Sequence, residues 1–254
     1  MTERASATVG LSRRRNWLIG AVAVVLAAAV AGGGYGFWYL FLRPAAPASV
    51  AQASLAPVPS GAAAQQLLAG GVDGTWKVDT SIGSFADNTS SFVGYRVQEQ
   101  LATIGGNVAV GRTPNVSGTL TISGTKLTTA TITADLTTLQ SDDSRRDGQL
   151  RRQGIETGTY PTATFTLTSP VEVTSVPADG QTVEVTAPGN LTLHGVTKEV
   201  QIPLTARLTG SVIEVTGSLP IVFADYGIQK PNSFIVLSIA DQGTLELQLF
   251  FTKS

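Results

Sequence analysis

The stretch TLTISGTKLTTATITADL, residues 119–136, consists of two runs in which apolar and polar side chains alternate. In the first run Leu120 and Ile122 stand opposite threonine and serine, and in the second the apolar side is formed by Ala130, Ile132, Ala134 and Leu136. Successive side chains of a β-strand point to opposite faces, so a period of two indicates half-buried strands. Threonine suits such a pleated surface. The stretch therefore predicts an all-β fold.

The same alternation continues on both sides of this stretch. Gly, Pro, Asn and Asp separate its segments, as expected of strands joined by turns. The pattern therefore predicts a mostly antiparallel sandwich or barrel. The further segments are regular in residues 163–167, 183–185, 200–208 and 245–251, and less regular in residues 75–78 and 91–97.

Residues 141–154 depart from this pattern because their end signals are those of a helix. Ser141 is a suitable N-cap, acidic residues fill the first turn, basic residues fill the last turn, and Gly154 is a typical stop. We expect a short helix over residues 142–153. Two acid–base pairs within it stand four residues apart, Asp142 with Arg146 and Asp147 with Arg151.

The N-terminal part has a different character. From Trp17 to Leu42 there is no charged side chain, and a helix of this length spans about 39 Å at about 1.5 Å per residue, enough to cross a bilayer. Residues 1–16 contain four arginines against one glutamate, which by the positive-inside rule places them in the cytoplasm. We expect a single-pass cell-membrane protein with its C-terminal part extracytoplasmic.

Two other interpretations of this region remain open. Arg14 and Arg15 loosely resemble a twin-arginine signal, and Ala51–Ala53 could serve as a cleavage site, so residues 17–42 could belong to a cleaved signal peptide. A buried core helix is the other alternative. Residues 43–72 are rich in Ala and Pro and predict a linker, which leaves residues 73–254 as the folded domain.

Composition excludes several classes of site. The chain has no cysteine, so disulfides, thiol nucleophiles, thiolate metal sites and a lipidated cysteine anchor are absent. From residue 73 onward, 12 of the 17 basic and 17 of the 18 acidic residues remain, a net charge of −5, which argues against nucleic-acid binding. A single histidine excludes a multi-histidine metal site. We expect no cofactor and no metal.

Two groups of residues offer chemistry. His194 is the one candidate general base, but no nucleophile partner is recognisable in sequence, and a structural hydrogen bond is the simpler role. The arginines of the predicted helix could bind a phosphate group. The alternative is a solvated helix face paired with its own aspartates. These arginines are Arg145, Arg146, Arg151 and Arg152.

The segment LTLHGVTK, residues 191–198, resembles the most recognisable stretch of the YceI-like family. Further family marks follow in the same order along the chain. They are the W-x-x-D of Trp76 and Asp79, the R-D-x-x-L of Arg146, Asp147 and Leu150, the Y-P-x-A-x-F of residues 160–165, and the turn Tyr226, Gly227 and Ile228. Together they span nearly all of the predicted β domain.

This resemblance implies an extended lipocalin-like antiparallel β-barrel with one short helix near one end. Family members are typically exported, and the resemblance implies an apolar cavity for a polyisoprenoid or similar long-chain lipid, with no established catalytic residues. The chain departs from the family at two places. Gly154, Ile155 and Glu156 replace the usual aromatic pair after the helix, and Ala224 and Asp225 stand where an arginine often precedes the late turn.

We therefore expect a membrane-tethered lipid-binding protein rather than an enzyme, and a homodimer is compatible with this. The alternatives are a structural or stress-related envelope module with a filled barrel, and a lipid-acting enzyme. The headgroup contacts we expect are Arg146, His194 and Lys198. The residues we expect to line an apolar interior are Ile132, Phe165, Val185, Ile202, Leu204, Phe223 and Leu247.

Overall fold

The computed structural model describes residues 45–50, 71–102, 105–231 and 236–254, together with Trp17, Val24, Gly33 and Gly34. The chain divides into two compact units, residues 1–45 and 46–254. Within the described residues, no helix has the length and apolar character needed to span a membrane. Apart from those four residues, the predicted span, residues 17–42, lies outside the described part, as does most of the predicted linker, residues 43–72.

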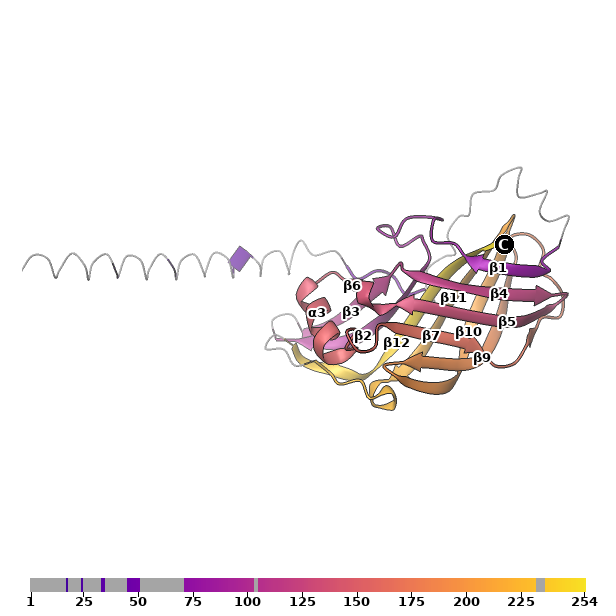
Figure 1. Ribbon diagram of the computed structural model, residues 1–254. Coiled ribbons are helices and arrows are strands. Elements are labelled where there is room, and N and C mark those ends of the chain that lie inside the picture. The colour runs from indigo at the N-terminus through magenta and orange to yellow at the C-terminus, as the bar shows by residue number, and fades with distance from the viewer. Residues whose placement is uncertain are drawn as a thin grey trace, which may run out of the picture. The chain divides into compact units, whose positions relative to one another are not determined.

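The second unit is a closed antiparallel barrel (Figure 1). Its eight strands follow the order β1, β4, β5, β7, β9, β10, β11 and β12, and β12 pairs again with β1, where Trp76 stands opposite Lys253. The bounds of these strands are Gly74–Val78 (β1), Val116–Ser123 (β4), Lys126–Asp135 (β5), Thr162–Leu167 (β7), Thr182–Leu193 (β9), Val196–Thr209 (β10), Val212–Val222 (β11) and Val236–Lys253 (β12).

Three more strands extend the wall at one end of the barrel. β2 (Phe92–Leu101) pairs with the first part of β12, and β3 (Gly105–Thr113) pairs with β2. The two-residue β6 (Gln140–Ser141) pairs with β3 and is the third of these strands. Separately, the two-residue β8 (Val171–Glu172) pairs with the start of β5. The β2–β3 hairpin, the β9–β10 turn and the end of β11 all lie at this end, which we call the hairpin end.

The helix is shorter than the sequence predicts and begins later. α3 spans Ser144–Gln149 and continues as one π-helical turn, η3, over Leu150–Gly154. The predicted N-cap Ser141 is wrong, because Asp143 caps the helix by accepting a hydrogen bond from the Arg145 N–H. Ser141 lies in β6 and donates to Asp147 through its N–H and its hydroxyl. These bonds occupy the carboxylate that we expected to pair with Arg151.

The two faces of the barrel wall differ in composition. One face carries the main hydrophobic core, in which Trp76, Leu120, Leu249 and Phe251 are buried. The opposite face of β5, β7 and β9 is rich in threonine and largely exposed. The predicted period-two pattern is therefore confirmed, with the apolar rows pointing into the barrel. Two short 3₁₀ turns complete the described secondary structure, η2 (Leu136–Thr138) and η4 (Phe223–Tyr226).

Part of the outer face is covered by the chain's own N-terminal segment. Arg96 donates from Nη2 to the carbonyl of Pro47 at 2.6 Å, and Arg112 donates from Nη2 to the carbonyl of Ala48 at 3.1 Å. Both guanidinium groups also contact Glu246, whose side chain is 1% exposed. Residues 46–50 are thus attached to the barrel wall, although they fall within the stretch that composition predicts as a linker.

Candidate functional site

All seven predicted lining residues lie on the inner face. Strand register pairs Ile132 with Phe165 and Val185 with Leu204. Ile202 stands opposite Ala187, and Leu247 opposite Gly217. Phe223 follows β11 directly and lies over Gly243 of β12, which belongs to the inner row. The structure thus brings the seven side chains to one surface.

The packing of the inner face varies along the barrel axis. At the end where β1 meets the C-terminal part of β12, Trp76 is 3% exposed and Phe251 is 2% exposed. Of the seven predicted lining residues, Ile202 is also buried, but the other six are only half-buried. Two of these six, Ile132 and Leu247, pack against the buried core, and two others, Val185 and Leu204, border a hollow of about 600 Å³.

Inner-face glycines make room for the largest lining side chains. A Cβ added to Gly189 would lie 2.3 Å from the ring of Phe165, and one added to Gly217 would lie 2.5 Å from Cδ2 of Leu204. Atoms that close would overlap, so a residue with a side chain would displace its neighbour. The two glycines interrupt the period-two pattern, which explains why the sequence pattern did not mark them as part of the site.

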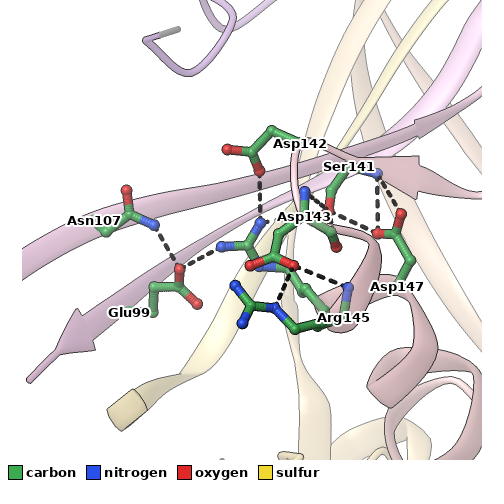
Figure 2. A network of polar contacts seen from close by, with 8 residues as sticks. Glu99, Asn107, Ser141, Asp142, Asp143, Arg145 and Asp147 are labelled. Carbon is green, nitrogen blue, oxygen red and sulfur yellow. Dashed lines mark hydrogen bonds and ion pairs between the residues drawn. The ribbon is translucent and has the colours of Figure 1, made fainter. Parts of the chain in front are cut away.

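A polar network lies at the hairpin end of the inner face (Figure 2). Arg146 of α3 donates from Nη2 to Glu99 Oε1 and from Nη1 to Asp142 Oδ1, both at 2.7 Å. Glu99 Oε1 also accepts a hydrogen bond from Asn107 Nδ2 at 2.5 Å. Burial lowers the pKa of Arg146, but the charge of Glu99 and then that of Asp142 outweigh it, so the pKa is raised and the guanidinium stays charged.

Tyr95 stands between this network and the apolar interior. On β2 the inward row runs Val93, Tyr95, Val97 and Glu99, so polarity rises toward the hairpin end. The Tyr95 hydroxyl is buried and has no hydrogen-bond partner. Burial raises the pKa of this hydroxyl, which keeps it neutral. The ring lies over Gly111, where a Cβ would come within 2.4 Å of it.

His194 occupies the β9–β10 turn at the same end of the barrel. Its φ of 52° places it in the left-handed region that is uncommon for residues other than glycine. Its Nδ1 lies 3.0 Å from the carbonyl oxygen of Tyr226, and its Nε2 lies 3.0 Å from Glu156 Oε2. The Tyr160 ring stacks on it at a tilt, with centroids 4.3 Å apart. His194 therefore joins three turns, as the structural role predicts.

The three predicted headgroup residues lie at one end of the barrel but do not form one cluster. Lys198 Nζ lies 3.4 Å from Asp225 Oδ1, on the same side as His194. Arg146 lies in the network of β2 and α3 instead. Each of the three contacts at least one carboxylate. In the part of the chain that the structure describes, no group of three metal-ligating side chains is found.

A hollow of about 600 Å³ lies against β9, β10 and β11, and Val50 borders it. Its lining includes the polar residues Glu184, Thr186 and Thr216. Two of the seven predicted lining residues, Val185 and Leu204, also border it. The hollow therefore combines polar side chains with part of the predicted apolar lining.

The comparisons with known proteins agree with the fold. The model of the YceI-like domain matches residues 85–251. Among solved structures, a polyisoprenoid binding domain from Saccharophagus degradans, implicated in plant cell wall breakdown, is 22% identical with a TM-score of 0.52. The alignment covers 70% of this chain and 98% of that one.

A second similar structure is BcnA from Burkholderia cenocepacia. It is 23% identical with a TM-score of 0.50, and the alignment covers 68% of this chain and 98% of that one. The search of curated proteins gives no match. These two structures share the barrel, and the family model covers most of the barrel unit, including the inner rows, the helix and the His194 turn. The chain therefore belongs to the YceI-like domain family.

Proposed function

We propose that the barrel binds a polyisoprenoid or another long-chain apolar lipid in its interior. The observation that carries this proposal is the set of inward side chains that remain half-buried in a closed barrel, Ile132, Phe165, Val185, Leu204, Phe223 and Leu247. Two of them, Val185 and Leu204, border a hollow of about 600 Å³. A tightly filled barrel is expected to bury its inward side chains as it buries Trp76 and Phe251.

A long apolar chain suits this surface energetically. Removing apolar groups from water is worth about 0.8 kcal/mol per methylene, so a tail of many such groups gains affinity along its whole length. The inward row of β2 changes from the apolar Val93 to the charged Glu99 toward the hairpin end. This end therefore offers a polar position for a headgroup. The similarity to a polyisoprenoid binding domain adds support for this ligand class.

The chain is further proposed to act outside the cytoplasm, tethered to the cell membrane through residues 17–42. The support is the uncharged run of 26 residues and the arginine cluster before it. Protease added to intact spheroplasts should then release the barrel. Complete protection of the barrel from the protease would contradict an extracytoplasmic location.

Residues 46–254 form one compact unit and offer a direct test of lipid binding. Native mass spectrometry of this unit should show a bound species that disappears after solvent extraction, and lipid analysis of the extract would identify its class. A unit that purifies empty and takes up neither polyprenols nor fatty acids would reject lipid binding and favour the structural module.

A further inference from the structure

The hairpin end of the barrel carries more carboxylates than basic groups around the expected headgroup position. The basic side chains there are Arg146, His194 and Lys198, and the carboxylates in contact with them are Glu99, Asp142, Glu156 and Asp225. Three basic side chains thus face four carboxylates. A phosphorylated headgroup would add further negative charge to a region that already has an excess.

The charge of Arg146 is already matched by two carboxylates. Nη2 donates to Glu99 and Nη1 to Asp142, each at 2.7 Å. The guanidinium keeps further N–H groups, but the side chain is only 15% exposed. A phosphate that approached Arg146 would also approach the negative charges of Glu99 and Asp142.

The other two basic groups are no more available. Both ring nitrogens of His194 face acceptors, the Tyr226 carbonyl and the Glu156 carboxylate. These two contacts occupy both ring nitrogens, so the ring offers neither to a headgroup. Lys198 faces Asp225 across 3.4 Å. No predicted headgroup residue therefore supplies an uncompensated positive charge.

The same geometry favours a different headgroup. A carboxylate accepts hydrogen bonds and a hydroxyl can donate one. Glu99 lies on the inward row of β2, and Asn107 stands opposite it on β3. We infer that the hairpin end selects a long-chain lipid with an uncharged, hydrogen-bond-donating headgroup, such as a free alcohol, over the phosphorylated form of the same lipid. This inference rests on the proposed lipid-binding function.

The experiment is a competition for a photoreactive polyprenol that cross-links to the full-length chain in phosphatidylcholine nanodiscs. The competitors are the polyprenol, its monophosphate and its diphosphate, all of one chain length. The alcohol should compete at least ten times more effectively than the diphosphate. A diphosphate that competes equally or better would overturn the inference while leaving lipid binding intact. Absence of cross-linking inside the barrel would reject both proposals.

Two double variants test whether the carboxylate charges, and not a folding defect, set the headgroup preference. The double change Glu99→Gln and Asp142→Asn removes two negative charges with little change in shape, and should raise competition by the diphosphate at least tenfold relative to the alcohol. Circular dichroism checks that this variant is folded. The matched control is Arg151→Gln with Arg152→Gln, since both arginines are exposed on η3, and it should leave the preference unchanged. A preference for alcohol that survives in the Glu99 and Asp142 variant would contradict the assigned cause.

Discussion

Arg146 Nη2 lies 2.7 Å from Glu99 Oε1 although the two residues are 47 positions apart in the sequence. This contact joins α3 to the inward face of β2, and both side chains are largely buried. The helix is therefore attached to the barrel through a charge pair as well as through apolar contacts such as Ile155.

Removal of one partner should destabilise the barrel strongly. Arg146→Ala would leave Glu99 buried with only Asn107 beside it, and loss of a buried partner costs about 3 kcal/mol. Urea unfolding followed by fluorescence measures the change. Arg152→Ala, at an exposed position, should change stability by less than about 0.5 kcal/mol. Equal effects of the two substitutions would refute a specific role of the pair.

The glycine beneath Phe165 should not tolerate a side chain. Gly189→Ala places a Cβ 2.3 Å from the ring and 2.6 Å from the Thr166 carbonyl oxygen, so we expect a loss of about 1–3 kcal/mol. Gly158→Ala is the control, because no atom lies within 4 Å of its added Cβ. Thermal unfolding of both variants, with Phe165→Leu as partial rescue of Gly189→Ala, checks the steric cause.

Filling the interior should reduce lipid uptake. Val185→Phe adds a ring to a half-buried inward position, whereas Thr131→Phe adds the same ring to an exposed outward position away from the hollow. Displacement of a fluorescent fatty acid should weaken at least tenfold in the first variant and remain unchanged in the second. A parallel loss in both variants would indicate a folding defect instead of a blocked cavity.

The Asp79 carboxylate should contribute to the loss of folding stability at low pH. Asp79 accepts hydrogen bonds from the Ser81 hydroxyl at 2.6 Å and the Ser81 N–H at 2.8 Å, and the hydroxyl bond is the main cause of a pKa held below the usual value of 3.8. A lowered folded-state pKa stabilises the fold above the unfolded value, and the contribution is lost as pH falls through the folded value. Asp79→Asn should therefore flatten the stability curve below about pH 4. An unchanged slope would exclude this contribution.

The sequence predicts the strands best where one face is solvent-exposed. β4, β5 and β10 alternate clearly, and their register follows that pattern. β11 was not predicted, because Glu214 and Thr216 on its outer face are buried together with Ile213 on its inner face. β3 was not predicted either, since Gly105, Gly106 and Gly111 interrupt its pattern. Local periodicity does not reveal a strand that is covered on both sides or rich in glycine.

The site was predicted in part for a similar reason. The inward rows follow from alternation, so the inward orientation of the seven positions could be predicted from sequence, whereas their contact with a ligand stays a prediction. The partner of Arg146 could not, because Asp142 lies one helical turn away whereas Glu99 belongs to a distant strand. The His194 contacts with Glu156 and Tyr226 likewise depend on turns that meet only in the folded barrel.

The attachment of Pro47 and Ala48 to Arg96 and Arg112 makes part of the predicted linker a section of the barrel wall. Both guanidinium groups also contact Glu246, whose side chain is 1% exposed. A fragment that begins at the first strand would therefore leave each arginine one acceptor short beside a buried carboxylate. A truncated form that keeps these contacts has to begin near residue 46 instead of residue 73.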